Sequence, residues 1–363
     1  MNSKQRVHAA LRRQPVDRVP IHVTFHPETV AALARLLEVP RHAVEDILDN
    51  DVRMTWVNND YFALGVFHDQ DGEQHTDFWG IRWVHQGSVN RLAESPLATM
   101  TPEQVRKFCF PLQHVEELVS RLGPFVAGAY EHFVGCDVSP CVLEMYRRLR
   151  GPERLAADMV SEPALIEEML DRCAAFAALL AELACRRFPL DWLWAGDAAP
   201  PQDAHAITPQ FWRRQVKPHL QLVFDVGKRH RLWVGYRGCG DLRPILPDLI
   251  EMGLDVLHLA ANTCADVDPL DLSREFGEQL AFVGGLPAHD VLARGTADDV
   301  RRFTRRLIEG MTVRGGGYVL APTECLPRGT PPDNIFAMYA EAGLSREEIQ
   351  DRAAAVRARQ SQK

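Results

Sequence analysis

Short apolar runs that alternate with amphipathic stretches constrain the fold of this 363-residue chain more than any other feature. Strands separated by helices form βαβ units, and such units pair in a parallel sheet. Seven strands can be recognised, and an eighth that the pattern does not reveal would complete a closed barrel, which we favour over an open sheet. We therefore predict an α/β protein with a (β/α)8 TIM-barrel fold. The seven candidate strands are Val19–Thr24, Phe125–Tyr130, Asp191–Ala195, Leu232–Tyr236, Val256–Ala260, Leu280–Gly284 and Tyr318–Ala321.

Helix-start signals stand between these runs. Thr101-Pro102-Glu103-Gln104 combines an N-cap, a proline at the first helical position and a capping-box glutamine. Ser161-Glu-Pro opens a long amphipathic run that ends at Arg187. Further starts are expected at Thr208-Pro209, Thr296-Ala-Asp-Asp299 and Ser345-Arg-Glu-Glu348.

The chain contains no internal repeat and no Gly/Ser-rich linker, which favours one domain over residues 1–363. Residues 1–120 are expected to form an N-terminal helical, loop-rich extension with the first strand. A hairpin is predicted near Phe78–Val89. Residues 121–345 would form the barrel core, and residues 346–363 a C-terminal helix.

Charge and cysteine content exclude some classes of protein. The net charge of −8 argues against nucleic-acid binding, because a protein that binds nucleic acid needs a dense basic face. No apolar stretch approaches the roughly 20 residues that span a bilayer. No signal peptide is visible, so the eight irregularly spaced cysteines are expected to be reduced and the protein cytoplasmic. Cys109, Cys173 and Cys185 are expected to be small buried hydrophobic residues.

Two strand-end segments carry the residues that are best suited to catalysis or metal binding. Tyr236-Arg237-Gly238-Cys239-Gly240-Asp241 and Ala321-Pro322-Thr323-Glu324-Cys325 each follow an apolar run. The carboxyl ends of barrel strands are where active sites are built, because the loops there are held by a rigid scaffold. Two cysteines far apart in the sequence could therefore share one metal or one substrate.

The order of segments resembles the uroporphyrinogen decarboxylase superfamily of TIM barrels over nearly the whole chain. That superfamily includes the decarboxylase itself and the zinc-dependent methylcobamide:thiol methyltransferases. No segment alone is specific, but together they are specific for the superfamily. The matching segments are Asp17-Arg-Val-Pro20, Thr76-Asp-Phe-Trp-Gly80, Leu149-Arg-Gly151, Trp194-Ala-Gly-Asp197, Cys239-Gly240, Leu246-Pro-Asp-Leu-Ile-Glu-Met-Gly253, Phe282-Val-Gly-Gly285, Gly315-Gly-Gly-Tyr318 and Thr330-Pro-Pro-Asp-Asn334.

The decarboxylase branch carries an Arg-Gln-Ala-Gly-Arg segment after the first strand, which binds substrate carboxylates. The matching stretch here, Ile21-His-Val-Thr-Phe-His-Pro-Glu28, contains no arginine. Because a porphyrinogen carries many carboxylates, the loss of these guanidinium groups argues against ordinary uroporphyrinogen decarboxylation.

The methyltransferase branch implies zinc held by a His-x-Cys pair and a second cysteine. Such a zinc ion lowers the pKa of an acceptor thiol. This chain retains Cys239, has Arg237 at the histidine position, and offers Glu324 or Cys325 at the second cysteine position. Arginine cannot ligate zinc. The metal site is therefore either rebuilt with a histidine from another strand or absent. The candidate histidines are His22, His26, His258 and His289, of which the first three are also candidate substrate-binding residues.

Asp197 and Arg237 are the other candidates for the mouth of the barrel. The superfamily places an acidic residue where Asp197 stands, and its carboxylate would bind an amine or hydroxyl, act as an acid or base, or cap the Ala198–Asp203 segment. Arg237 would bind an anionic group of the substrate, or form an ion pair with Asp241 or Asp197.

The resemblance implies a methyltransferase with Asp197, Cys239 and Glu324 as catalytic residues. It would pass a methyl group to a small thiol or amine. The donor would be cobalamin or another corrinoid, free or on a corrinoid protein. Zinc would be bound by Cys239 with Glu324 or Cys325. One alternative is a metal-free lyase or decarboxylase for a small acidic substrate or a porphyrinogen. Another is a non-catalytic barrel that binds a tetrapyrrole or a partner. A homodimer is compatible with each of these.

Overall fold

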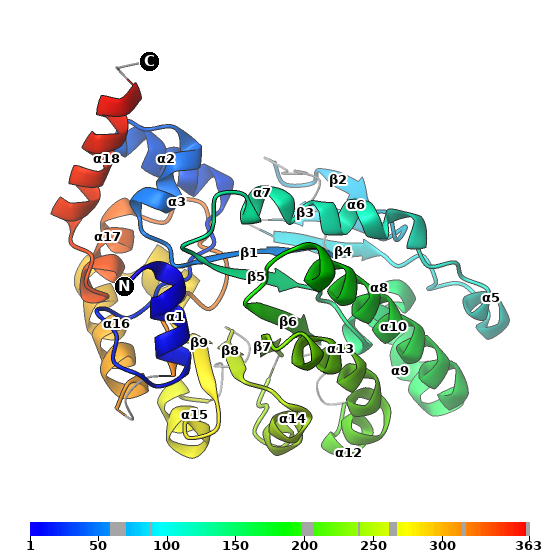
Figure 1. The fold of residues 1–363 in the computed structure, drawn as a ribbon. Helices are drawn as coiled ribbons and strands as arrows, with labels where there is room; N and C mark the ends of the chain where they lie inside the picture. Colours follow the sequence, from blue (N-terminus) through cyan, green and yellow to red (C-terminus); the bar gives the residue numbers. More distant parts are fainter. Residues whose placement is uncertain are drawn as a thin grey trace. The chain divides into compact units, whose positions relative to one another are not determined.

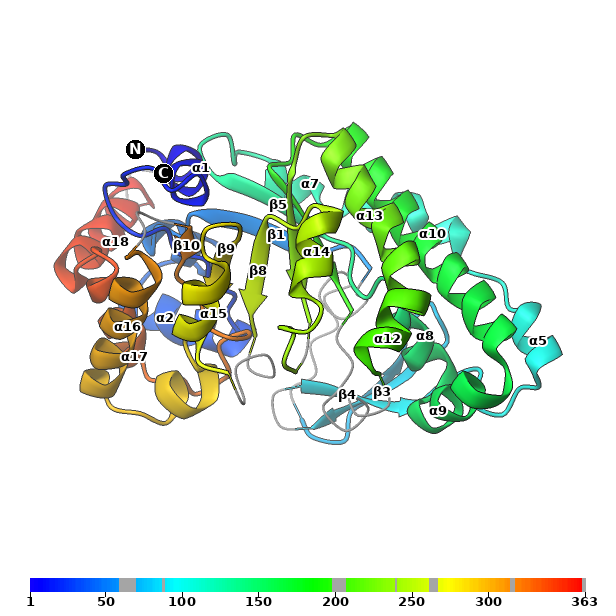
Figure 2. The same ribbon diagram turned by 90° about the horizontal axis from the view of Figure 1, so that it is seen from below.

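The computed structural model describes residues 1–58, 70–86, 89–197, 207–238, 240–260, 267–313 and 317–360. These residues fall into two compact units, drawn in Figures 1 and 2 and described here separately. The first unit comprises Met1–Arg53, Tyr130–Phe133 and Val256–Lys363, and the second comprises Met54–Ala129 and Val134–Asp255. The prediction that the chain forms a single domain stays a prediction.

Four parallel strands in the order β1-β5-β6-β7 form the centre of the second unit. The first two of them begin in the first unit. The strands are β1 (Val52–Trp56), β5 (Phe133–Asp137), β6 (Trp192–Gly196) and β7 (Trp233–Arg237). The side chains of β5 and β6 are all buried, as are the three central ones of β7, as expected for a parallel sheet covered by helices.

Two glycines in these strands make room for tryptophans on the neighbouring strand. Gly135 pairs with Trp192, and Trp194 pairs with Gly235. A Cβ atom on Gly135 would overlap the Trp192 indole, and one on Gly235 would lie 2.5 Å from the Trp194 ring. The two indoles pack edge to face with their centroids 5.0 Å apart. The packing of the two tryptophans in the interior of this unit therefore requires glycine at the positions that face them.

Three helices of the second unit, α5, α10 and α12, begin at or within two residues of the positions that the sequence signals. Thr101 forms the expected capping box with Gln104 at the start of α5. Helices α10 and α13 pack side by side along the outside of the unit (Figure 2). The helical segments are α5 (Pro102–Arg106), η2 (Leu112–His114), α6 (Val115–Ser120), α7 (Gly123–Val126), α8 (Leu143–Arg150), α9 (Pro152–Ser161), α10 (Pro163–Arg187), α12 (Pro209–Phe211), η3 (Trp212–Val216), α13 (Lys217–Arg229) and α14 (Leu246–Met252).

A small antiparallel sheet also belongs to the second unit. It consists of β2 (Gln74–Thr76), β3 (Arg82–Gln86) and β4 (Val89–Glu94) in that order. The Asp77 carboxylate closes the turn between β2 and β3 by accepting the N–H groups of Trp79 and Ile81, each at 2.9 Å. The predicted hairpin near Phe78–Val89 is confirmed.

The first unit contains a second set of parallel strands in the order β8-β9-β10. They are β8 (Val256–Leu259), β9 (Ala281–Gly284) and β10 (Tyr318–Val319). The predicted strand Val19–Thr24 lies beside the last of these, joined by isolated parallel bridges from Ile21 to Leu320 and from Phe25 to Leu326. Pro20 has no N–H group to donate, which interrupts the ladder at this point.

Helices surround these strands in the first unit. The predicted capping box at Thr296 and Asp299 opens α16, which packs against α17 (Figure 1). The helical segments are α1 (Ser3–Leu11), α2 (Pro27–Leu37), η1 (Arg41–Ala43), α3 (Val44–Ile47), α15 (Pro269–Phe276), η4 (Ala288–Ala293), α16 (Ala297–Met311), α17 (Pro332–Glu341) and α18 (Arg346–Gln360).

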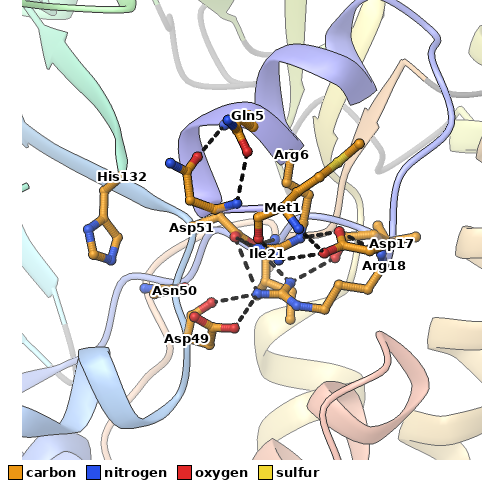
Figure 3. Close-up of polar contacts among 12 residues, drawn as sticks. Met1, Gln5, Arg6, Asp17, Arg18, Ile21, Asp49, Asn50, Asp51 and His132 are labelled. Atoms are coloured by element: carbon orange, nitrogen blue, oxygen red, sulfur yellow. Dashed lines mark hydrogen bonds and ion pairs between the residues drawn. The ribbon is translucent and has the colours of Figure 1, made fainter. Parts of the chain in front are cut away.

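A buried charge network fixes the start of the strand-like segment 20–26 (Figure 3). Asp51, whose side chain is fully buried, pairs with the guanidinium groups of Arg6 and Arg18 and accepts the Ile21 N–H at 2.8 Å. Arg6 also reaches Asp17 at 2.7 Å. The Asp17-Arg18 pair of the sequence motif therefore holds this segment in place, because a buried carboxylate needs both charge partners and donors.

Parallel strands joined by helices confirm the predicted α/β class and its barrel type. One expected strand is wrong: Phe125–Tyr130 overlaps α7, where Pro124 lies in the first turn of the helix, and the strand is Phe133–Asp137 instead. Cys173 is buried, but Cys109 is exposed and Cys185 is only half-buried, which corrects the expectation for these two residues. None of the described helices has the length and apolar composition required to cross a membrane.

Candidate active site

Asp197 follows the last residue of β6 and is held by the start of α8. Its Oδ1 accepts the N–H groups of Val142 at 3.3 Å and Glu144 at 2.7 Å, and its Oδ2 accepts that of Leu143 at 2.9 Å. The carboxylate therefore caps α8 from a neighbouring strand. Its proposed role as a cap for Ala198–Asp203 concerns residues that lie outside the described part of the chain.

The pKa of Asp197 lies far above that of an ordinary aspartate. Burial raises the pKa to about 7, although the three backbone hydrogen bonds act in the opposite direction. A carboxyl group that titrates near neutral pH can take up or release a proton during a reaction. The geometry and the pKa thus support an acid–base role.

A cavity of about 210 Å³ lies beside Asp197 at the carboxyl ends of β6 and β7. Its wall is mostly apolar and includes Leu143, Ile207, Trp212 and Tyr236. A second carboxylate, Asp241, also lines it. Small-molecule sites in proteins have this character, with few polar groups in an apolar wall.

The two carboxylates of this cavity differ in their partners. Asp241 is bound by the Arg243 guanidinium through Nε to Oδ1 at 2.8 Å and Nη2 to Oδ2 at 2.6 Å. The arginine lowers the pKa of Asp241. Among the described residues, no lysine, arginine or histidine forms an ion pair with Asp197. Of the two carboxylates in the cavity, Asp197 is therefore the one that can pair with a cationic group of a ligand.

Arg237 ends β7 next to Asp197 in the backbone, since the Asp197 N–H donates to the Arg237 carbonyl at 3.1 Å. Its side chain turns toward Asp137, at the end of β5, with Nη2 3.4 Å from Oδ2. The guanidinium also packs on the Trp56 ring, 4.8 Å from its centroid. The ion pairs weighed for Arg237, with Asp241 or Asp197, are thus wrong. Its side chain remains 29% exposed, which leaves donors for a substrate.

Asp137 is a site residue that the sequence analysis missed. It is buried, and burial raises its pKa against the opposing charge of Arg237. A signal was present, because a single carboxylate ends the run Phe133-Val-Gly-Cys136. The run was too short to compete with Phe125–Tyr130.

The first unit holds the three predicted substrate-binding histidines. His22 is buried, and burial together with Arg53 lowers its pKa to about 4, which keeps the ring neutral. His26 caps α2, where its Nδ1 accepts the Glu28 N–H at 3.2 Å. His258 pairs in register with Val283 inside β8 and β9. Substrate binding by these histidines stays a prediction.

The first unit also contains Glu324 and Cys325. Glu324 is 40% exposed, with Oε1 3.6 Å from Nε2 of His289. The Cys325 thiol lies 3.8 Å from the Leu326 carbonyl, and burial raises its pKa to about 12. Of these two residues, Glu324 is the more accessible.

The described donors do not assemble a zinc site. Among residues that the structure places, no three His, Cys, Asp or Glu side chains are grouped so that they could hold a metal ion. Cys239, the residue on which the zinc prediction depends, lies outside the described residues. The described donors therefore do not fit zinc by themselves, and no reaction step is derived through a metal.

Replacing Arg237 with lysine is expected to raise KM by about tenfold with little change in kcat. A lysine carries the charge but cannot reproduce the two-point contact that a guanidinium makes with a carboxylate or phosphate. The measurement is steady-state kinetics with a thiol or amine acceptor that also carries a carboxylate for Arg237 to bind. Arg243→Lys is the control, because Arg243 is already occupied by Asp241. If the two variants behave alike, Arg237 serves only to pair with Asp137.

Comparisons with known proteins agree with this fold. The sequence model of the uroporphyrinogen decarboxylase family matches residues 101–343. A methyltransferase from Methanosarcina mazei is 16% identical, with a TM-score of 0.70 over 94% of this chain and 98% of that chain. This likeness shows the fold alone. A 3-keto-D-glucoside 4-epimerase from E. coli, 13% identical over 71% of this chain and 87% of its own, has a TM-score of only 0.36. No curated protein gives a significant match to this chain.

Proposed function

This chain belongs to the uroporphyrinogen decarboxylase family, and on that premise we propose that it transfers a methyl group to a small thiol or amine. The observation that carries the proposal is Asp197, a carboxyl group with a pKa of about 7 that lines a small, mostly apolar cavity. The resemblance of the fold to a protein named as a methyltransferase supports it.

The proposed chemistry uses Asp197 as a general base. The acceptor occupies the cavity and gives the proton of its S–H or N–H bond to the Asp197 carboxylate. The freed electron pair forms a bond to the methyl carbon, and the donor leaves with the electrons of the bond that breaks. A methylated corrinoid, free or carried by a corrinoid protein, supplies the methyl group. The start of α8 holds the base in place through its N–H groups.

The test is methyl transfer from methylcobalamin to thiols and amines, with the methylated product measured by mass spectrometry. Product that forms with the protein, and not with a boiled sample, supports the proposal. Failure to methylate any thiol or amine, with the protein folded, would refute it.

Zinc at Cys239 with Glu324 or Cys325 remains our prediction for the metal. Protein purified without chelators is expected to contain about one equivalent of zinc by elemental analysis, and Cys239→Ser should lose it. Cys173→Ser, in the buried face of α10, is the control that should retain the metal. Activity in a protein with less than about a tenth of an equivalent of any transition metal would remove thiol activation by zinc.

Decarboxylation of an acidic substrate is the second candidate, and the Arg237–Asp137 pair favours it. Arg237 would hold a substrate carboxylate. The raised pKa of Asp137 would let that residue donate a proton to the carbon that loses CO₂. Release of CO₂ from small acids or a porphyrinogen, without a methyl donor, would support this function. Saturable binding of a tetrapyrrole without either reaction would indicate a binding protein.

A further inference from the structure

The Asp197 cavity has the charge and the wall of a site for an organic cation. We propose that it binds a compact alkylammonium group, with Asp197 as the counter-ion. The inference rests on the proposed function, because it selects an amine rather than a thiol as the acceptor.

Charge is the first argument. Two carboxylates line the cavity, and none of the described lining residues is basic. Arg243 neutralises Asp241, while Asp197 has no cationic side chain paired with it among the described residues. The nearby guanidinium groups of Arg147 and Arg148 are paired with Glu144 and not with Asp197. An anionic ligand would be repelled here, and a cation would be attracted.

The wall of the cavity is the second argument. Ile207, Leu143 and Ile245 provide apolar surface, and Trp212 and Tyr236 provide aromatic rings. A bare metal ion needs several oxygen or nitrogen ligands, and among the described lining residues only Asp197 and Asp241 have a carboxylate. An ammonium group with alkyl substituents places its charge against the carboxylate and its methyl groups against the apolar and aromatic side chains. A cavity of about 210 Å³ restricts the ligand to a few carbon atoms.

The protonation state of Asp197 agrees with such a ligand. Burial makes the Asp197 carboxyl group costly to ionise and so raises its pKa. A cation beside it would favour the ionised form. In turnover, the bound ammonium group would give its proton to Asp197 and so become the neutral amine that attacks the methyl group.

The test compares three probes of nearly equal shape by isothermal titration calorimetry at pH 8, without a methyl donor. They are tert-butylammonium, tert-butanol and pivalate. The ammonium is expected to bind at least about tenfold more tightly than the alcohol, and pivalate should not bind. Tighter or equal binding of the alcohol or of pivalate would overturn the proposal.

Variants locate the binding. Asp197→Asn should weaken ammonium binding at least about tenfold, whereas Asp241→Asn should weaken it less, because Arg243 already neutralises Asp241. Ile207→Trp, which enlarges a side chain of the cavity wall and leaves the Asp197 carboxylate in the chain, should abolish binding. Asp171→Asn, on the exposed face of α10, is the control. Unchanged affinity in both Asp197→Asn and Ile207→Trp would place the cation elsewhere and refute the inference.

The two hypotheses can fail separately. Ammonium binding without methylation of any amine or thiol would leave the site assigned and remove the proposed function. Methylation of thiols by a protein that does not bind tert-butylammonium would retain the function and remove the inference.

Discussion

Replacing Asp197 with asparagine is expected to lower the methyl-transfer rate by about 10²- to 10⁴-fold, the usual contribution of a general base. The amide cannot accept the acceptor's proton. It keeps one oxygen for the N–H groups at the start of α8, so the variant should fold. The measurement is kcat with saturating acceptor, alongside the melting temperature. Asp171→Asn, an exposed aspartate of α10, should match the wild type.

The pH dependence separates this role from a structural one. The wild-type rate should rise as the pH increases through about 7, because Asp197 acts as a base only after it loses its proton. The stability should change in the opposite sense. The unfolded carboxyl loses its proton near 3.8 and the folded one near 7, so the free energy of unfolding falls as the pH rises between these values. Asp197→Asn should remove both effects. An unchanged rise in rate near pH 7 in this variant would assign the titration to another group.

Replacing Gly135 with alanine is expected to lower the free energy of unfolding by about 3 kcal/mol, at the upper end of overpacking effects. The new Cβ would overlap the indole of Trp192, which is fully buried and packed against Trp194. Neither ring can move without displacing its neighbour. Denaturant unfolding followed by circular dichroism measures the change.

Two further variants test the cause of this loss. Gly123→Ala, where an added Cβ meets no atom within 4 Å, should leave the stability nearly unchanged. The double variant Gly135→Ala with Trp192→Leu should lose less free energy of unfolding than the two single variants lose together. The smaller leucine side chain relieves the overlap with the new Cβ. Additive losses would show that the indole is not what limits position 135.

Local signals in the sequence predicted many of the elements. Thr101 with Gln104 and Thr296 with Asp299 form capping boxes where their spacing placed them, since a cap depends only on residues within one turn. The strand β5 was missed because Phe133–Asp137, which contains Gly135, is short and ends in a carboxylate, whereas the run Phe125–Tyr130 just before it is one residue longer and has no charged residue. The glycine has a function that no local pattern reveals, because its partner, Trp192, is 57 residues away.

The same limit applies to the candidate site. Asp197 could be predicted because a carboxylate that ends a buried strand is a local feature. Its partner, the start of α8, could not, since a strand of the same unit brings them together over more than 50 residues. Arg237 was correctly singled out, but its contacts with Asp137 and Trp56 depend on three strands that meet only in the folded chain. The walls of the cavity likewise come from β7 and from segments that follow β5, β6 and β7.

The division into two compact units has a spectroscopic consequence. All seven tryptophans of the chain lie between residues 54 and 255, within the second unit, and the first unit contributes only tyrosines such as Tyr318 and Tyr339. Indole fluorescence therefore reports on the second unit, while far-ultraviolet circular dichroism reports on the helices of both. Denaturation curves from the two signals coincide if the units unfold as one cooperative body, and they separate if one unit melts first.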